Sequence, residues 1–189
     1  MSELLLFGEK SVPDTLVAAL EPAAPAFEVT VYGSPAPQGS KSAKRNQHSG
    51  RIQLVESSKR VKPWREDVVG AALTVRGKVR GWRPLTGPLL AEMVFTIARP
   101  KTHFGTGRNA GTVRPSAPDL PVGPPDLSKL VRSTEDALTT AGIYRDDALL
   151  VRYRALAKHY HTDHNVVPDV LDVSGCVIRL WRLGTEVVR

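Results

Sequence analysis

Cysteine is almost absent from this sequence, in which Cys176 is the one thiol among 189 residues. A single cysteine cannot form an intramolecular disulfide, and its scarcity fits a reducing compartment. Long apolar runs are missing as well. The run that follows the first three residues covers only Leu4 to Phe7, whereas a secretory signal needs about 7–15 apolar residues and a membrane span about 20. We therefore expect a cytoplasmic protein that does not span a membrane.

Acidic residues are scarce over one long stretch of the chain. Residues 27–125 hold 16 basic and only six acidic residues, a net charge of +10, while residues 1–26 carry −3 and residues 126–189 balance at nine of each. The whole chain has a formal charge of +7 and a pI near 9.8. A cationic block beside a neutral block rich in carboxylates indicates that one part binds a polyanion and another carries chemistry. A surface made basic for solubility would give the same balance.

Hydrophobic residues make up 41% and charged residues 24% of the chain, enough to bury one core. Residues 1–26, rich in Ala, Pro and Glu, predict a flexible extension, and residues 27–189 predict the folded domain. Apolar patterning predicts strands over Phe27–Tyr32, Ile52–Val55, Leu89–Ala98, Leu149–Tyr160 and Cys176–Leu183. It predicts helices from Pro63 to Gly77 and from Asp126 to Gly142. The expected fold is α/β (α+β), a small mixed sheet of about four to five strands with two main helices.

Three aspartates have the pattern of a magnesium-dependent nuclease. Asp126 follows Pro124-Pro125 at a predicted helix start, and Asp146 and Asp147 come one helix and one turn later. Mg²⁺ takes hard oxygen ligands, and phosphodiester hydrolysis uses it to orient water and offset charge. Each aspartate also has a structural explanation. Asp126 could be an ordinary helix N-cap, and the Asp146-Asp147 pair a solvated turn.

The order of motifs around these aspartates resembles a known family. The motifs are Pro125-Asp126-Leu127-Ser128-Lys129-Leu130-Val131-Arg132, then Asp136-Ala137-Leu138-Thr139, then Gly142-Ile143-Tyr144-Arg145-Asp146-Asp147, with Lys158 in a later strand. In this spacing they resemble the core of RusA-type Holliday junction resolvases. Two looser matches precede them, from Gly33 to Lys41 and from Lys62 to Arg65.

The resemblance implies a small homodimer that binds four-way junctions and other branched DNA. It implies cleavage by paired symmetric nicks with Mg²⁺, or Mn²⁺ in its place, during recombination and repair. Such proteins are common in phages and prophages, so the implied location is the cytoplasm of a bacterial cell or a phage-infected host.

By position, Asp126 matches the family's first catalytic aspartate and Asp147 its last, while Arg132 falls where some members have a lysine. The predicted catalytic residues are Asp126, Ser128, Lys129, Arg132, Asp146, Asp147 and Lys158. The predicted metal ligands are Asp126, Asp146 and Asp147. Lys129, Arg132 or Lys158 is expected to hold or polarise the scissile phosphate.

Ser128 departs from the family pattern, which has a second aspartate at this position. A hydroxyl is a neutral and weaker ligand than a carboxylate, so the change is expected to weaken metal binding and raise the barrier. Asp146, Glu135 and Asp119 could replace the lost charge, with Glu135 two helical turns from Asp126. Serine can also bind Mg²⁺ directly. The alternative function is therefore a junction-binding protein with weakened catalysis.

The basic stretch is the predicted phosphate-binding surface. Its residues are Lys41, Lys44, Arg45, Arg51, Lys59, Arg60, Lys62 and Arg65. Trp64, beside it, could stack on a base or pack its helix on the sheet. Arg99, at the start of a loop over residues 99–125, could contact DNA or a second subunit. His159, His161 and His164 could form a transition-metal site or an exposed strand end.

Overall fold

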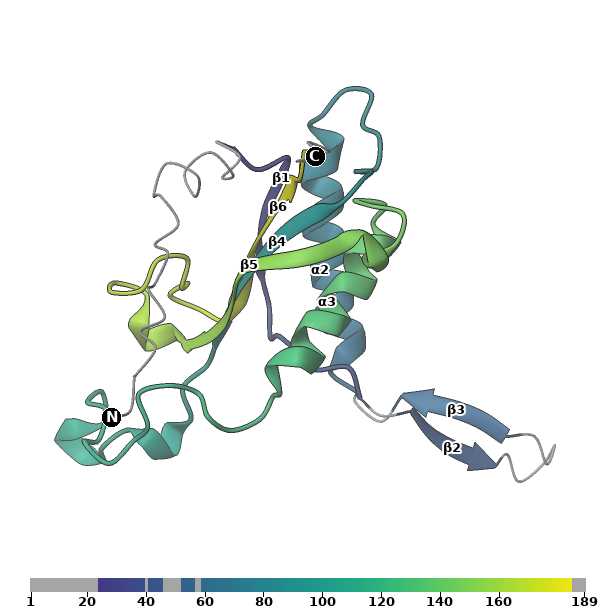
Figure 1. Ribbon diagram of the computed structural model, residues 1–189. Helices are drawn as coiled ribbons and strands as arrows, with labels where there is room; N and C mark the ends of the chain where they lie inside the picture. The colour runs from purple at the N-terminus through teal and green to yellow at the C-terminus, as the bar shows by residue number, and fades with distance from the viewer. Residues whose placement is uncertain (1–23, 40, 46–51, 57–58, 185–189) are drawn as a thin grey trace, which may run out of the picture.

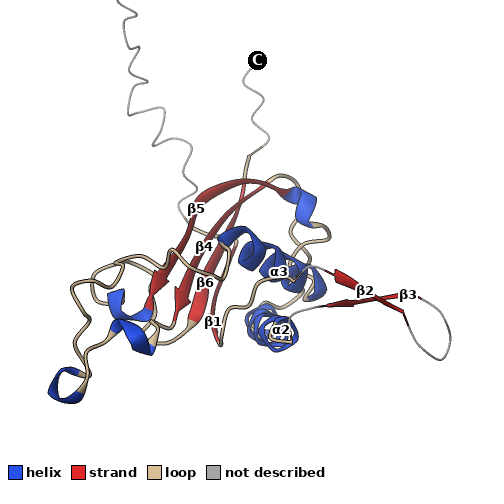
Figure 2. Ribbon diagram, turned by 90° about the horizontal axis from the view of Figure 1, so that it is seen from below, coloured by secondary structure: helices blue, strands red, loops and turns tan. Residues whose placement is uncertain are grey.

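The computed structural model of the chain describes residues 24–39, 41–45, 52–56 and 59–184, with backbone only for residues 41–45 and 52–56. One four-stranded sheet, in the order β1-β6-β4-β5, has both long helices on one of its faces (Figures 1 and 2). The sheet strands are β1 (Phe27–Tyr32), β4 (Leu89–Ile97), β5 (Leu150–Tyr160) and β6 (Gly175–Arg182). The helices are α2 (Val61–Gly77) and α3 (Leu127–Thr140). The predicted α+β class, with its mixed sheet and two helices, is confirmed.

A second, two-stranded antiparallel sheet projects away from this body (Figure 1). It consists of β2 (Lys41–Arg45) and β3 (Ile52–Glu56). The sequence predicted β3 one residue shorter and did not predict β2, because Lys41–Arg45 has almost no apolar alternation. Four short 3₁₀ helices complete the secondary structure of the described residues: η1 (Lys101–His103), η2 (Gly107–Asn109), η3 (Asp147–Leu149) and η4 (His161–Asp163).

The core lies between the sheet and the two helices. In β1 the alternate residues Phe27, Val29 and Val31 are buried and their neighbours are exposed, as a strand with one covered face requires. Trp64 is fully buried and donates its indole N–H to the Thr134 hydroxyl at 3.1 Å, joining α2 to α3. Trp64 is therefore a packing residue, and the structure excludes base stacking by this side chain.

Parallel pairing between β4 and β5 determines where α3 lies. Two parallel strands cannot be joined by a tight hairpin, so the chain must cross over between them. The crossover consists of the long loop over residues 98–126 and then α3. As a result α3 runs in the opposite direction to β5. The first residue of the helix lies near the end of the strand, and the last turn of the helix lies near its start.

Arg99 anchors the crossover loop where it leaves β4. Its side chain is 5% exposed and its guanidinium lies 4.1 Å from the centre of the Tyr160 ring. The same group donates to the Thr162 hydroxyl at 2.9 Å and to the Pro118 carbonyl at 3.0 Å. These contacts fasten the start of the loop and its residue Pro118 to the end of β5. Arg99 is thus a structural residue and is not available to contact DNA.

The predicted N-terminal extension, residues 1–26, lies outside the described residues except for its last three. The backbone N–H of Ala26 donates to the Leu180 carbonyl at 2.8 Å and so continues the β1–β6 pairing. Within the described part of the chain, none of the helices has the length and apolar character needed to cross a membrane.

Arg179 ties three segments together on the face of the sheet. It lies on β6 directly opposite Glu28 of β1 and Glu92 of β4, and it donates to both carboxylates at 2.9 and 2.7 Å. It also holds Asp169 with two hydrogen bonds of 2.7 and 2.6 Å. These hydrogen bonds, together with the arginine charge, lower the pKa of Asp169 below its ordinary value of 3.8 despite partial burial.

Replacing Asp169 by Asn is expected to lower the free energy of unfolding by about 1–2 kcal/mol at pH 7. Because the folded-state pKa of Asp169 is depressed, its contribution is complete above the unfolded pKa near 3.8 and is lost as the pH falls through the folded value. Urea denaturation at pH 7 and pH 3 measures the change. Asp172→Asn, at an exposed position nearby, is the matched control. An equal loss at both pH values would contradict the assigned charge interaction.

Candidate functional site

Asp126 occupies the N-cap position of α3 but does not use its side chain as a cap. Its backbone is extended, with φ −66° and ψ 133°, and its carboxylate accepts no hydrogen bond from the helix N–H groups. The carboxylate instead pairs with the Lys129 ammonium at 2.8 Å, and both side chains are more than half exposed. The hydrogen bond and charge of Lys129, with a smaller effect of Lys158, lower the pKa of Asp126. Asp126 is therefore an ionised, solvent-facing carboxylate.

Lys158 comes to the same place from the end of β5. Its ammonium donates to the carbonyl oxygens of Gly123 at 2.7 Å and Pro125 at 2.9 Å. Those carbonyls belong to the segment that leads into α3 through the cis Pro124-Pro125 bond. Two of the three donors of Lys158 are thus used to hold the backbone next to Asp126.

Asp146 and Asp147 lie at the start of η3, just before β5. Asp146 caps this 3₁₀ turn by accepting the Ala148 N–H at 2.8 Å, which is the turn role considered from the sequence. Asp147 makes no such capping bond, and both residues are exposed. They line an open, polar cavity of about 400 Å³. The other lining residues are Arg65, Asp136, Thr139, Thr140 and Arg145.

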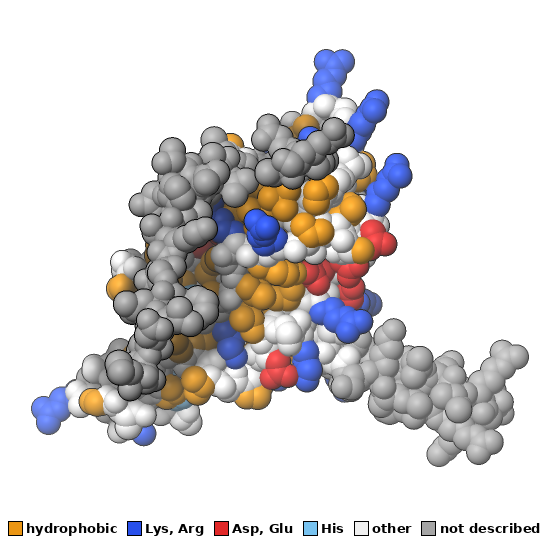
Figure 3. Space-filling view, in the orientation of Figure 1, with side chains coloured by type: hydrophobic (Ala, Val, Ile, Leu, Met, Phe, Trp, Pro, Cys, Tyr) orange, Lys and Arg blue, Asp and Glu red, His pale blue; other side chains and the backbone are white. Residues whose placement is uncertain are grey.

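Asp126 and Asp147 lie toward opposite ends of α3. Asp147 shares its cavity with Asp136 and Thr139, on the C-terminal half of the helix. The ten residues from Asp126 to Asp136 span about 15 Å along a helix axis. Figure 3 shows acidic side chains gathered on the right half of the molecule, with basic side chains above and below them. The structure does not bring these two aspartates to one point.

Glu135 is a further carboxylate close enough to Asp147 to be affected by its charge. It is half-buried on α3 and accepts a short hydrogen bond from the Tyr153 hydroxyl of β5. Burial raises the pKa of Glu135, the hydrogen bond from Tyr153 opposes this, and the nearby charge of Asp147 raises it further. The sequence placed Glu135 correctly, two turns from Asp126, but could not show that the start of β5 lies beside it.

The other predicted residues of α3 are presented to solvent. Ser128, Lys129 and Arg132 are exposed on its first two turns. Arg132 lies on the helix between Asp126 and Glu135. Its charge opposes the rise in the pKa of Glu135 that burial causes. Asp119 is also exposed, and its backbone carbonyl accepts from Arg99 at 3.3 Å. The histidines do not form a cluster with acidic residues that could hold a metal ion, within the described ranges.

The predicted phosphate-binding stretch is only partly described. Lys41, Lys44, Arg45 and Arg51 lie outside the side chains that the structure describes. Lys59, Arg60 and Lys62 are exposed at the start of α2, and Lys62 pairs weakly with Glu66 at 3.8 Å. Arg65 differs from them. It crosses from α2 to α3 and pairs closely with Asp136, so part of its charge is used inside the protein.

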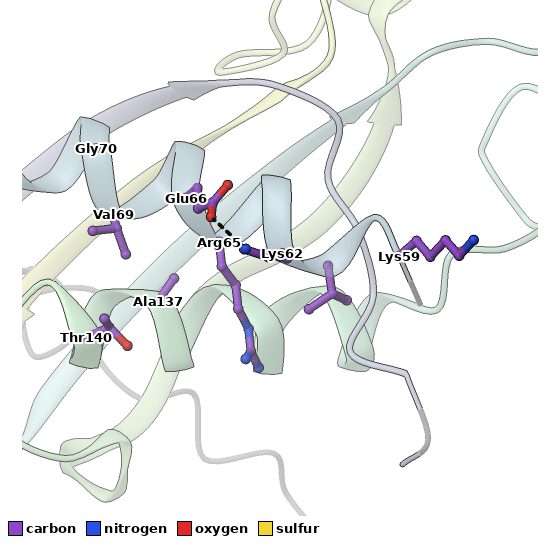
Figure 4. A pocket seen from close by; sticks show the side chains of 9 residues that line it. Lys59, Lys62, Arg65, Glu66, Val69, Gly70, Ala137 and Thr140 are labelled. Carbon is purple, nitrogen blue, oxygen red and sulfur yellow. Dashed lines mark ion pairs between the residues drawn. The ribbon is translucent and has the colours of Figure 1, made fainter. Parts of the chain in front are cut away.

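A groove of about 750 Å³ runs between α2 and α3 beside these cations (Figure 4). Its apolar residues are Val61, Val69 and Ala137. Lys59 lies at one end of the groove, and Arg65 points across it toward α3. The phosphate-binding prediction stays untested for this surface, since its geometry places cations but no ligand.

A divalent cation fits the chemistry of these donors but not their arrangement. Carboxylate and hydroxyl oxygens are the ligands that Mg²⁺ and Mn²⁺ take. Across the described residues, however, no three His, Cys, Asp or Glu side chains are grouped closely enough to hold a metal ion. Asp126 stands at one end of α3, while Asp146 and Asp147 lie at the other end with Asp136, which pairs with Arg65. The described side chains therefore do not form an assembled metal site.

Comparison with known families identifies the chain. A family model described as Endodeoxyribonuclease RusA matches residues 33–167, which is most of the sequence. The match begins just after β1 and includes α2, β4, α3 and β5. No curated protein matches the chain. The endonucleases of this family resolve Holliday junctions, bind branched DNA and generally depend on divalent metal ions. The chain belongs to the RusA endodeoxyribonuclease family.

Proposed function

We propose that this protein is a Mg²⁺-dependent endonuclease that resolves four-way DNA junctions by paired, symmetric nicks in recombination and repair. The observation that carries the proposal is the family match over residues 33–167, which includes the Asp126 and Asp146-Asp147 motifs on exposed positions. Symmetric nicking needs two copies of the site, so the active form is a homodimer. The expected location is the cytoplasm of a bacterial cell or a phage-infected host.

The charges around Asp126 support phosphodiester chemistry at this end of α3. Asp126 is ionised at neutral pH, and the exposed cations Lys129 and Arg132 follow it on the helix. Cations placed next to a reacting phosphate offset the charge that develops during displacement. Lys158 acts differently, because its hydrogen bonds to Gly123 and Pro125 make it a positioning residue for Asp126. Mn²⁺ is expected to replace Mg²⁺, since both take oxygen ligands.

The second candidate is a junction-binding protein whose catalysis is weakened. Two observations favour it: Ser128 brings no charge to the first turn of α3, and no three carboxylates converge among the described residues. In this case the cationic surface binds DNA while the chemical step is slow. The two candidates differ in the cleavage rate of the wild-type protein and not in its affinity.

Replacing Asp126 by Asn is expected to reduce junction nicking by at least about 100-fold, because it removes a carboxylate that is a predicted ligand of the metal ion. Binding of the junction without divalent metal is expected to stay equal or to tighten, since a negative charge facing the phosphates is lost. Nicking rates and fluorescence anisotropy measure the two effects.

Asp147→Asn, measured in the same way, tests the other end of α3, and Asp172→Asn is the matched control. Mn²⁺ binding to each variant, followed by electron paramagnetic resonance, gives a readout independent of cleavage. Wild-type nicking by Asp126→Asn, with a folded protein, would show that the site is wrongly assigned.

Replacing Ser128 by Asp restores the charge that the family pattern has. If the natural protein is an active nuclease, we expect the Mg²⁺ concentration for half-maximal nicking to fall several-fold, while the rate at saturating Mg²⁺ changes less than about tenfold. A titration of nicking rate against Mg²⁺ measures both. A rise of more than about 100-fold in the saturated rate would instead identify the natural protein as a weakened enzyme.

A further inference from the structure

Three arginines surround one cavity on the side of the sheet where α3 ends and β5 begins. The cavity has a volume of about 450 Å³ and is lined by Arg83, Arg145 and Arg182, together with Pro84 and Thr86. No carboxylate is among its lining residues. Within the described part of the chain, none of the three guanidinium groups has an ion pair or hydrogen-bond partner. Three like charges are thus held together without compensation from the protein.

The backbone holds all three arginines in place. Arg83 precedes Leu85, whose N–H donates to the Ile143 carbonyl at 2.8 Å in a short parallel bridge between Leu85 and Tyr144. Arg145 follows Tyr144 directly, and both bridge residues are buried. This bridge joins the segment of Arg83 to that of Arg145.

Three further contacts complete the frame. The Trp82 indole N–H donates to the Gly142 carbonyl at 3.2 Å. Arg182 is the last residue of β6 and pairs with Leu89 at the start of β4, while the Leu183 N–H donates to the Pro88 carbonyl at 2.9 Å. The three side chains therefore start from fixed points of the fold and not from a free loop.

An unpaired arginine cluster on a fixed frame is suited to a phosphate. The planar guanidinium donates two parallel N–H groups to phosphate oxygens, and these charge-assisted bonds are stronger than neutral ones. A bound phosphate would also remove the repulsion among three cations. Thr86 adds a hydroxyl donor at the edge of the cavity.

Arg145 connects this cavity to the candidate catalytic residues. It lines the arginine cavity and also the polar cavity that contains Asp146 and Asp147. A DNA strand whose phosphate lies among the arginines would therefore place a neighbouring phosphate beside Asp147. The carboxylates repel a phosphate on their own, so a cationic site next to them favours approach of the strand.

We propose that Arg83, Arg145 and Arg182 form a binding site for a non-scissile backbone phosphate of the junction, next to the one that is cut. This inference rests on the proposed function, because it names how the same DNA strand is held. None of these three arginines belongs to the basic stretch at residues 41–65, which the sequence had indicated as the phosphate-binding surface, although Arg65 of that stretch lines the neighbouring cavity with Arg145.

The test is the double variant Arg83→Gln/Arg182→Gln, which leaves Arg145 and both aspartates intact. The matched control is Lys78→Gln/Arg80→Gln, which removes the same charge from exposed positions in the same region that do not line the cavity. Junction affinity is measured by fluorescence anisotropy in EDTA between about 50 and 200 mM salt. We expect at least about tenfold weaker binding for the cavity variant at 100 mM salt and at most about twofold for the control.

The salt dependence gives a second readout. The slope of log affinity against log salt is negative, and loss of one phosphate contact reduces its magnitude by about 0.9, whereas the control leaves it unchanged. Ethylation of single phosphates gives a third: a phosphate next to the nick whose ethylation weakens wild-type binding is expected to lose its effect in the cavity variant. The melting temperatures of both variants should lie within a few degrees of the wild-type value, because all four replaced side chains are exposed.

The outcomes separate the two claims. Equal losses of affinity in the cavity variant and the control would overturn the arginine site. The proposed function would still stand if the wild-type protein binds and nicks junctions. A wild-type protein that neither binds nor nicks junctions would overturn both. A cavity variant with a lower salt slope and one lost ethylation contact supports the site.

Discussion

Parallel pairing of β4 and β5 is the constraint on which the rest of the structure depends. A parallel pair requires a crossover, and here the crossover is the long loop followed by α3. The helix must then return along β5 in the opposite direction. Consequently Asp126 lies where β5 ends, next to Lys158, and Asp147 lies where β5 begins. The spacing of these aspartates in the sequence follows from the length of the helix between them.

Basic residues serve two distinct purposes in this protein. Arg99, Arg179 and Lys158 are bonded to carbonyls or carboxylates of distant segments and hold the sheet, the loop and the start of α3 in place. Arg83, Arg145 and Arg182 have no such partners among the described residues. The net charge of +7 therefore does not show which cations are available to DNA. A cation without an internal partner, such as each of these three arginines, can bind an external anion without breaking internal bonds.

Much of the fold was predictable because its signals are local. The alternation of Phe27–Tyr32 gave β1 with its observed bounds, and the apolar stripe after Asp126 gave α3. The observed ends of several helices and strands differ from the predicted ends by one or two residues. At these ends the backbone hydrogen-bond pattern does not stop where the side-chain pattern does. The first helix, for example, begins at Val61 and not at Pro63. The strand β2 was missed because its residues are mostly basic.

Motif spacing predicts which residues make up the site, but it gives no geometry. It points to Asp126, Asp146 and Asp147, yet it could not show that the charge of Asp147 reaches Glu135 or that Lys158 holds the backbone before Asp126. Glu135 and Asp147 are 12 positions apart in the sequence, and Lys158 is 33 and 35 positions from Pro125 and Gly123, so these contacts depend on how the sheet and α3 pack. The burial of Arg99 could not be predicted from the sequence either. A lone arginine in a Gly- and Pro-rich loop is expected at the surface, whereas here its burial depends on contacts with Tyr160 and Thr162.

The central claim is that this fold cuts branched DNA, and cleavage of a labelled four-way junction by the purified wild-type protein tests it most directly. The reaction is run with Mg²⁺, with Mn²⁺ and with EDTA, next to a linear duplex of the same sequence. The account predicts paired, symmetric nicks in the junction that require the metal ion and are absent from the duplex. Tight junction binding without nicks in either metal would contradict it and establish a DNA-binding member of the family with weakened catalysis.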